Sequence, residues 1–491
     1  MKILLVNPPE YGFLSWIYRS WNPSVYKLGS WYRQNTNYDF EIYNLRPELQ
    51  ESRCAGGCRF VNSCDIDKAE ARKKLGFPPS KLKNIEMLTS EQGIYSYKGE
   101  IITKQVGNRS CGNWENEHIS RALFRIGRPI DGYVKKLLDY KPDEVQISGL
   151  FTYWWEGVKE VVDITKKVSP KTKISIGGIY PKLAPEHTDL LKVDHVNIKS
   201  KAFKQDFTWM DLTLFEDVPC MIDVITSLGC PNSCGYCAVH MIEGHKRLFR
   251  DPMDVVNELE YYANNGVKYV RFLDSNLLCT YEKHFKIILD EIIKRNIDLC
   301  FISYGGVEAR FVTEENLNLM KQAGFEGMNI PIETVSPDLL KRWNRTLESP
   351  MWNNLSKIIK KVGGEVKSFM LMGCQNQSEQ ELLITAKRIE DLGMKPVALP
   401  LTPIPGTTEF NESFRRFREN WTLEQLHPLL YPLASEKMSV KFLEEMFIKY
   451  SNHQNLGDLT YHPSNAPYQR YGVNGKTFVN NSNWEWEEEY V

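Results

Sequence analysis

The stretch SLGCPNSCGYCAVH, residues 227–240, decides how this sequence is interpreted. It spaces three cysteines as C-x3-C-x2-C, at Cys230, Cys234 and Cys237, after an apolar strand pattern and before a helix. Iron–sulfur clusters are held by cysteine thiolates, normally four for a cubane. Three cysteines can ligate three irons and leave the fourth open, and an open metal position is where a substrate binds. The stretch therefore predicts a 4Fe–4S cluster with one open iron.

A zinc knuckle is the structural alternative for the same stretch. Zinc sites usually pair C-x2-C units or add histidine, and His240 and His245 follow the cysteines. The long array of strands and helices that begins at the triplet is hard to explain as a zinc scaffold. We therefore interpret the triplet as an iron–sulfur site.

From Met221 to Leu401, apolar strand patterns alternate with helical ones. The strand candidates are MIDVITS, VKYVRFLD, DLCFIS, GMNIPIE, VKSFMLMG and PVALPL. One of the helices opens on a capping box formed by Ser378 and Glu381. Strand–helix–strand alternation predicts parallel pairing, and six units are too few for an eight-stranded barrel. Residues 215–410 are therefore predicted to form a partial (β/α)6 TIM-type barrel.

The residues before this array are predicted to form a separate domain, giving an α/β fold overall. Residues 1–205 carry the strand patterns KILLV, FEIYNL, DEVQISGL and KISIGG, which indicate a doubly wound, Rossmann-like sheet. A polar, loop-like, cysteine-bearing insertion interrupts it at about 46–120. Residues 411–491 are predicted to be a small α-helical extension that is either solvated or lid-like.

Composition limits the location and the partners. The 491 residues include 61 basic and 62 acidic ones, so the net charge of −1 does not recruit nucleic acid or an anionic membrane. No apolar run approaches the roughly eighteen residues that a membrane span needs. The start MKILLVNPPE lacks a signal-peptide cleavage site, and the eleven cysteines then favour thiols or ligands over disulfides. We expect a cytoplasmic protein without a nucleic-acid signature.

With this triplet opening this array, the chain resembles the radical S-adenosylmethionine (SAM) superfamily over residues 221–410. In that family the open iron chelates the amino and carboxylate groups of SAM. An electron from the cluster breaks a sulfur–carbon bond, and the resulting 5′-deoxyadenosyl radical takes hydrogen from unactivated carbon. The resemblance implies a radical SAM enzyme that needs an electron donor of the flavodoxin or ferredoxin type.

The resemblance also implies SAM contacts near the triplet. Tyr236 is similar to the family's aromatic residue that lies against the adenine. The strand end FLDSN places Asp274, Ser275 and Asn276 where the family receives the SAM amino group, although the commoner Gly-Gly-Glu is absent here. Salt bridges or caps at strand ends are the structural alternative for these polar residues.

Two later strand ends resemble further SAM positions. Glu308 and Arg310 match positions for the methionine carboxylate and nearby groups, and Glu333 matches a position that approaches the ribose. All of these residues follow strands, and the carboxyl ends of parallel strands form the catalytic face of a barrel. The resemblance therefore implies one shared SAM-binding edge.

The domain order is similar to the subgroup whose first domain binds cobalamin. The matches are VNPP with Asn7, SGL with Gly149 and GGIYPKLAPE with Gly178. Glycines at strand ends let a flat cofactor approach the backbone. The signature D-x-H-x-x-G is absent, and the bulky residues 153–155 could instead fill the pocket. Cobalamin binding and an empty scaffold both stay open.

Four cysteines of the first quarter are candidates for a second metal centre. Cys54, Cys58, Cys64 and Cys111 could ligate an auxiliary cluster or a single metal ion. Unrelated reduced thiols are the alternative. The iron content would separate the two.

Cys374 ends the strand SFMLMG and is a candidate hydrogen donor. A thiol S–H bond is weak enough to give a hydrogen atom to a carbon radical, as in radical SAM epimerases. A small buried hydrophobe is the alternative. Cys279, near another strand end, competes for the same role.

Three functions follow from these observations. If cobalamin binds, the reaction is methyl transfer or related carbon–carbon chemistry. Without it, an epimerase or bond-forming enzyme would use Cys374 or an auxiliary metal cluster. The third function is a non-catalytic iron–sulfur or zinc module, which a basic aromatic stripe would favour, and the sequence has none. The sequence does not indicate the substrate.

Overall fold

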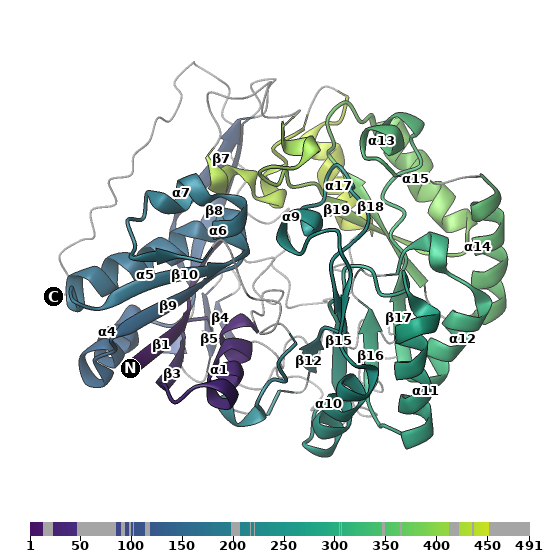
Figure 1. The fold of residues 1–491 in the computed structure, drawn as a ribbon. Coiled ribbons are helices and arrows are strands. Elements are labelled where there is room, and N and C mark those ends of the chain that lie inside the picture. Colours follow the sequence, from purple (N-terminus) through teal and green to yellow (C-terminus); the bar gives the residue numbers. More distant parts are fainter. Residues whose placement is uncertain are drawn as a thin grey trace.

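The structure is a computed structural model built on two parallel sheets. It describes residues 1–12, 23–46, 85–89, 94–97, 100–101, 103–112, 118–197, 207–216, 218–219, 221–303, 305, 307–345, 349–363, 366–411, 422–434 and 437–450. Figure 1 shows the two sheets in two halves that lie next to each other, each with its own helices.

The first sheet has five parallel strands in the order β11-β10-β9-β1-β3. The strands are β1 (Lys2–Asn7), β3 (Asp39–Asn44), β9 (Glu144–Gly149), β10 (Lys173–Gly178) and β11 (His195–Val196). Alternate residues of β1 enter different cores: Ile3 packs with α1, and Leu4 packs with α4 and α5. These helices are α1 (Ser24–Asn35), α4 (Ile130–Tyr140) and α5 (Trp155–Val168). Both faces are covered, as in the predicted doubly wound sheet.

The second sheet has six parallel strands in chain order, β12-β15-β16-β17-β18-β19, with β12 and β19 at its edges. The strands are β12 (Met221–Val224), β15 (Tyr269–Phe272), β16 (Cys300–Ser303), β17 (Phe325–Asn329), β18 (Val366–Met372) and β19 (Lys395–Pro400). The helices between them are α10 (Pro252–Asn264), α11 (Lys286–Arg295), α12 (Glu314–Gln322), α13 (Pro337–Arg342), α14 (Ser349–Val362) and α15 (Glu379–Asp391). This is the strand order expected for six βα units, and α15 opens on the predicted capping box.

The insertion at about 46–120 is not loop-like throughout, so that prediction was wrong. It contributes β4 (Ile85–Thr89), β5 (Ile94–Tyr97), β6 (Glu100–Ile101) and β7 (Thr103–Gly112). β7 pairs antiparallel with β8 (His118–Ile126), which also pairs with β2 (Glu10–Gly12). Buried ion pairs join this small sheet to α5, including Arg125 with Glu160 at 2.9 Å. The longest strand of the insertion, β7, has the largely polar sequence TKQVGNRSCG and carries little apolar signal.

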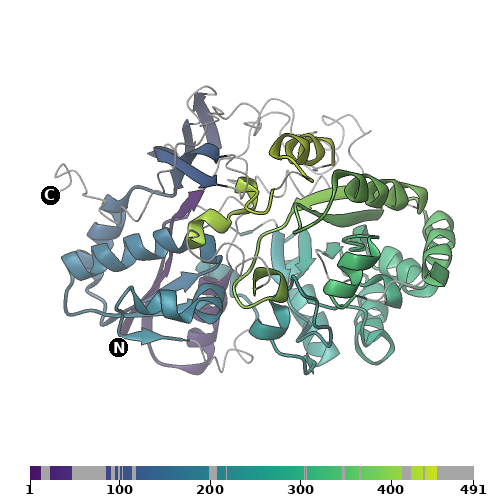
Figure 2. The ribbon, with the colours of Figure 1, turned by 90° about the horizontal axis from the view of Figure 1, so that it is seen from above.

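The C-terminal extension is also different from the prediction, because part of it is buried between the halves. Segment 422–434 contains the short turns η6 (Leu423–Leu426) and η7 (Pro428–Leu430), and helix α17 (Val440–Tyr450) follows. The indole Nε1 of Trp155 donates to Glu424 Oε2 at 2.8 Å. Leu430 packs in the same core as the second sheet. Figure 2 shows this yellow-green segment between the two halves.

One hydrophobic core runs from the first half into the second. It holds Ile3 of β1, Val25 of α1, Met210 of the connecting segment and Ile222 of β12. This core fixes the two sheets relative to each other. Among the helices that the structure describes, none is both long and apolar enough to cross a bilayer.

Candidate functional site

The cysteine loop, residues 229–238, leaves the short strand β13 (Ser227–Leu228) and enters helix α9 (Val239–Ile242). It begins at Gly229, whose φ of +84° suits glycine, and a Cβ there would lie 2.3 Å from the carbonyl oxygen of Lys246. The Cys230 amide donates to the Gly244 carbonyl at 3.1 Å. The loop is therefore fixed at its first cysteine by the turn that follows α9.

The middle of the loop is held from the far side of the sheet. The amide of Gly235 donates to the Trp343 carbonyl at 3.0 Å, and a Cβ at Gly235 would lie 3.1 Å from the carbonyl oxygen of Arg342. Glu409 accepts from Trp343 Nε1 at 2.9 Å, and its own amide donates to the Gly235 carbonyl at 2.8 Å. Residues more than 100 positions apart thus shape the loop.

The triplet of cysteines is half-buried, and all three are free thiols. Burial raises the pKa of Cys234, which Arg345 opposes, and burial raises the pKa of Cys237 to about 12. The chain alone therefore favours the neutral thiol at Cys234 and Cys237. A bound metal compensates thiolate charge and displaces these protons, so the surroundings suit metal-bound cysteines.

The strand end after β15 lies against the cysteine loop. Asp274 is buried and its carboxylate accepts from the Thr226 amide at 3.0 Å, from Thr226 Oγ1 at 2.7 Å and from Ser227 Oγ at 2.5 Å. Ser275 Oγ donates to Glu243 at 3.0 Å. Asp274 and Ser275 thus bind other residues of the chain, as expected if they serve to hold the strand ends together. Their role in binding SAM stays a prediction.

Glu308 connects the ends of β15 and β16 to the cysteine loop. Its Oε2 accepts from Asn232 Nδ2 and from Asn276 Nδ2, both at 2.9 Å. Its Oε1 pairs with Arg310 at 2.5 Å, and Arg310 also donates to Asn232 Oδ1 at 2.9 Å. Two of the predicted SAM contacts, Glu308 and Arg310, therefore meet at Asn232 of the cysteine loop, and Asn276 joins them through Glu308.

Glu333 and Tyr236 form the opposite side of the site with Arg345. Arg345 Nη1 donates to Tyr236 Oη at 2.7 Å, and Tyr236 packs edge-on against Trp343 with ring centroids 4.9 Å apart. Burial raises the pKa of Glu333 to about 7, against the opposing effects of Arg345 and Tyr236. Glu333 has a φ of +67°, which non-glycine residues rarely adopt and which clusters at functional sites.

Two buried acceptor atoms on this edge lack hydrogen-bond partners within the described part of the chain. They are Asn276 Oδ1 and Glu333 Oε2. An unsatisfied buried polar atom costs about 1–3 kcal/mol, so each such atom needs an explanation. A ligand with two hydrogen-bond donors, bound beside the cysteines, would satisfy both.

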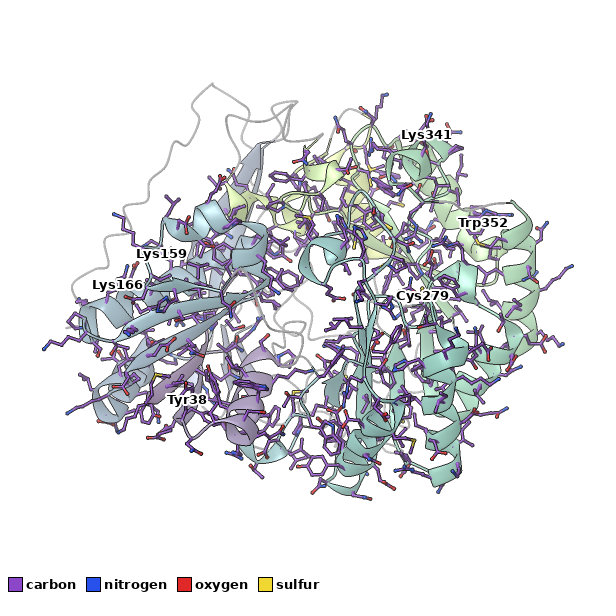
Figure 3. The ribbon with its side chains drawn as sticks, in the orientation of Figure 1. Tyr38, Lys159, Lys166, Cys279, Lys341 and Trp352 are labelled. Atoms are coloured by element: carbon purple, nitrogen blue, oxygen red, sulfur yellow. The ribbon has the colours of Figure 1, made fainter. Side chains whose placement is uncertain are left out.

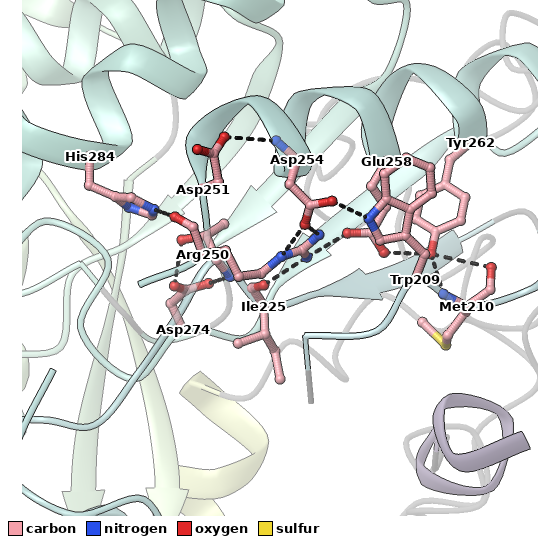
Figure 4. A network of polar contacts seen from close by, with 11 residues as sticks. Trp209, Met210, Ile225, Arg250, Asp251, Asp254, Glu258, Tyr262, Asp274 and His284 are labelled. Atoms are coloured by element: carbon pink, nitrogen blue, oxygen red, sulfur yellow. Dashed lines mark hydrogen bonds and ion pairs between the residues drawn. The ribbon is translucent and has the colours of Figure 1, made fainter. Parts of the chain in front are cut away.

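A buried polar network supports the site from beneath (Figure 4). Arg250 donates to Glu258 at 2.6 Å and to the Ile225 carbonyl at 3.1 Å. Its own carbonyl contacts His284 Nε2 at 3.0 Å. Tyr262 donates to Glu258 at 2.6 Å and accepts from the Met210 amide, so the network reaches the connecting segment. It anchors the backbone that leads into the cysteine loop.

Cys374 is 1% exposed and packs in a hydrophobic cluster with Leu339, Trp343, Leu371, Leu401 and Leu433. Burial raises its pKa well above the usual value. This environment favours the packing alternative, and hydrogen donation stays a prediction. Cys279 is half-exposed in the half that contains the second sheet (Figure 3). Burial raises the pKa of Cys279, and the charge of Arg247 opposes this rise.

The residues suggested for cobalamin make close contacts within the chain. A Cβ at Gly149 would lie 3.1 Å from Tyr180 Cδ1, and one at Gly178 would lie 2.3 Å from the Gly149 carbonyl oxygen. Asn7 Nδ2 donates to Asn44 Oδ1 at 2.9 Å. The packing of the chain alone accounts for these glycines, and their role in binding cobalamin stays a prediction.

The bulky residues after β9 fill the neighbouring space. Tyr153 stacks on Phe151 with ring centroids 5.2 Å apart, and the ring of His427 lies 4.8 Å from that of Tyr153. Trp154 is buried beneath the Arg46 guanidinium at 4.7 Å. The same short helix α6 (Ile179–Leu183) that covers Gly149 also contacts α9, so these strand ends do face the side of the molecule that carries the triplet.

Most of the auxiliary metal candidates lie in a part of the chain that the structure does not describe. Cys54, Cys58 and Cys64 lie outside the described residues, and Cys111 is described only by its backbone position in β7. Within the described ranges, no three His, Cys, Asp or Glu side chains are placed to share one metal ion.

Sequence reasoning missed several residues that build the site. Asn232 lies within the triplet's own spacing and could have been singled out. Glu243 accepts from the Gly229 amide at 2.8 Å, and Arg247 donates to Ser227 Oγ at 2.7 Å and to the Asn276 carbonyl at 2.8 Å. Arg345 reaches Tyr236 from 109 positions away. Nothing local in the sequence indicates these long-range contacts.

A parallel six-stranded sheet whose first strand leads into three free cysteines defines a protein of the iron–sulfur class. Residues 224–389 match the family described as the radical SAM superfamily, so this part of the chain is a radical SAM domain.

Similar curated proteins include two of known function. The bacteriochlorophyllide d C-12(1)-methyltransferase of Chlorobaculum tepidum is 26% identical over 238 residues, 47% of this chain and 50% of that protein. A tRNA-2-methylthio-N(6)-dimethylallyladenosine synthase of Bacillus cereus is 24% identical over 225 residues, 43% of each chain. The chain thus spans about half the length of the curated relatives it matches.

Among solved structures, the radical SAM methyltransferase TsrM of Kitasatospora setae, with cobalamin and a 4Fe–4S cluster bound, has a TM-score of 0.54. The identity is 12%, and the alignment covers 84% of this chain and 78% of that one. At this identity the likeness shows a common fold, which includes both halves of the chain.

Proposed function

We propose that this protein is a radical SAM enzyme that abstracts hydrogen from an unactivated C–H bond. The observation that carries the proposal is the pair of unsatisfied acceptors, Asn276 Oδ1 and Glu333 Oε2, on the strand edge that borders the free cysteine triplet. A purely structural iron–sulfur or zinc module does not need unsatisfied hydrogen-bond acceptors beside its cysteines. The radical SAM match over residues 224–389 supports the same function.

Cys230, Cys234 and Cys237 would hold the cluster, and the fit is good because all three are free, half-buried and set in a loop tied at both ends. The cluster, when bound with SAM, supplies the electron that cleaves SAM to the 5′-deoxyadenosyl radical. An electron donor of the flavodoxin or ferredoxin type, in a reducing cytoplasm, is part of the proposal.

The remaining residues would bind and orient SAM. Asn276 Oδ1 would accept from the amino group, and Glu333 Oε2 would accept from a ribose hydroxyl, because these are the donor groups of SAM. Arg310, 42% exposed at its side chain and paired with Glu308, is placed to meet a carboxylate. Tyr236 would lie against the adenine, and its orientation is set by Arg345 and Trp343.

Methyl transfer with cobalamin is the second candidate. It is favoured by the fold shared with TsrM over 84% of this chain. The packing at Gly149 and Gly178 gives it no support, and we derive no step through cobalamin. The alternative without cobalamin is an epimerase or a bond-forming enzyme, with Cys374 or Cys279 as hydrogen donor.

The proposal is tested by replacing Cys230, Cys234 and Cys237 with alanine together. We expect the variant to fold, to lose about four iron atoms per chain after anaerobic reconstitution and to form no 5′-deoxyadenosine from SAM under reducing conditions. Cys300→Ala is the matched control, because Cys300 lies in β16 on the same sheet. Undiminished 5′-deoxyadenosine formation by the triple variant would reject the proposal.

A further inference from the structure

Arg345 is a rigidly held cation beside the cysteine loop. It follows α13, and its backbone amide donates to the Leu340 carbonyl at 2.9 Å. One end of its guanidinium donates to Tyr236 Oη at 2.7 Å, and the other donates to the Pro331 carbonyl at 3.1 Å. Both of these acceptors are neutral, so neither cancels the charge of the guanidinium.

Arg345 lies beside the triplet in the fold. The tyrosine hydroxyl to which it donates at 2.7 Å belongs to Tyr236, the residue between Cys234 and Cys237 in the cysteine loop. The other cation of the site, Arg310, is paired directly with the Glu308 carboxylate at 2.5 Å and is 42% exposed at its side chain. Water and its partner screen Arg310 more than they screen Arg345.

Glu333 is the carboxyl group that opposes the positive charge of Arg345, and it compensates this charge only in part. Burial raises the pKa of Glu333 to about 7, so near neutral pH this carboxyl group is a mixture of charged and neutral forms. An arginine stays protonated throughout the physiological range. Arg345 is therefore a permanent cation on the side of the triplet that faces Tyr236.

We propose that Arg345 is a positioning residue that raises the reduction potential of the cluster held by the triplet. The inference rests on the proposed function. Reduction transfers one electron from a flavodoxin-type or ferredoxin-type donor to the oxidised cluster, and no atom is gained or lost. The reduced cluster carries one more negative charge, which a fixed nearby cation stabilises relative to the oxidised form. Arg345 thus favours the state that cleaves SAM.

The test is a potentiometric titration of the reconstituted cluster, followed by electron paramagnetic resonance, in the full chain. Arg345→Gln should lower the ratio of reduced to oxidised cluster at a fixed potential by about tenfold, or about 59 mV for a one-electron couple. Arg345→Lys keeps the charge and should stay close to the unsubstituted protein. A merely structural role predicts that the two variants behave alike.

Two further variants control the experiment. Lys341→Gln removes an exposed cation from the same helix, α13, and should leave the potential unchanged. Glu333→Gln removes the opposing negative charge and should shift the potential in the direction opposite to Arg345→Gln. If Arg345→Gln does not fold, Glu333→Gln and Arg345→Lys decide the matter.

The iron content and the reduction potential together distinguish a failure of the proposed function from a failure of the inference about Arg345. If the unsubstituted chain takes up no iron, the proposed function and this inference both fall. If Arg345→Gln carries about four iron atoms and an unchanged potential, the inference alone is overturned. An unchanged potential in a folded Glu333→Gln variant overturns it as well when Arg345→Gln cannot be purified.

Discussion

At Glu333 a single carboxyl group combines burial, a left-handed backbone and an unsatisfied oxygen. Burial raises its pKa from 4.5 to about 7, against Arg345 and Tyr236. The folded chain therefore binds this proton more tightly than the unfolded chain. The contribution is most stabilising below pH 4.5 and is lost as the pH rises towards about 7, with a slope of at most about 1.4 kcal/mol per pH unit.

Glu333→Gln should remove this slope from the cluster-free protein. The measurement is the free energy of unfolding in urea at several pH values across that interval. Glu390→Gln, an exposed change on α15, is the control and should leave the slope intact. A slope that persists in Glu333→Gln would contradict the assignment of the raised pKa to this residue.

Cys374 offers a second prediction at the residue scale. Because its thiol is buried among Trp343, Leu371 and Leu401, Cys374→Ala should cost about 1–2 kcal/mol of unfolding free energy and leave SAM cleavage intact. Cys279→Ala, at a half-exposed site, should cost less. If either folded variant still cleaves SAM but diverts the substrate radical to other products, that cysteine is the hydrogen donor.

At the scale of elements, the ion pair between Arg250 and Glu258 joins α10 to the backbone before the cysteine loop. Both side chains are 2% exposed, and the charged atoms lie 2.6 Å apart. Without the charge of Glu258, the buried Arg250 keeps only the half-exposed Asp254, 2.5 Å away, as an acidic partner. Glu258→Gln should therefore reduce the unfolding free energy by about 1–3 kcal/mol, measured by denaturant titration.

The matched control for this pair lies on the surface of α15. Lys387 and Asp391 are 2.7 Å apart, with side chains 70% and 49% exposed. Asp391→Asn should change stability by less than about 0.5 kcal/mol, because water already solvates the exposed charges. Equal losses at the two pairs would show that burial is not what makes the first one important.

The end of β10 allows the same kind of comparison between adjacent glycines. Gly178 has a φ of +106°, and a Cβ there would lie 2.3 Å from the Gly149 carbonyl oxygen. A Cβ at Gly177 would meet only Asn197 Cβ, at 3.9 Å. Gly178→Ala should cost more than about 2 kcal/mol, and Gly177→Ala should cost less than about 0.5 kcal/mol. Thermal unfolding of both variants without any cofactor checks this.

At the scale of the whole molecule, the two halves share one core. Ile3 and Val25 of the first half pack in the same cluster as Ile222 of the second, and Leu430 of the C-terminal segment joins them. Neither half can unfold without exposing apolar surface of the other. We expect a single cooperative transition in calorimetry of the cluster-free chain. Two well-separated transitions would contradict this coupling.

The elements that the sequence predicted best are those with local signals. The six strands of the second sheet appear in the predicted order, and the Ser378–Glu381 capping box is present. The insertion and segment 422–434 were misjudged because their structure depends on distant partners. Antiparallel β7 pairs with β8 through polar residues, and segment 422–434 becomes buried only when both sheets are in place.

By itself, the sequence determined the class of chemistry. Three cysteines within eight residues and the alternation of strand and helix patterns can both be recognised in short stretches of the chain. Tertiary structure alone decided what surrounds the triplet. It brought Arg345 to Tyr236, Asn232 to Glu308 and Tyr180 onto Gly149, and each contact joins residues from different elements. Such contacts depend on how whole elements pack, since burial and charge act through space, and that packing cannot be derived from the spacing of residues along the chain.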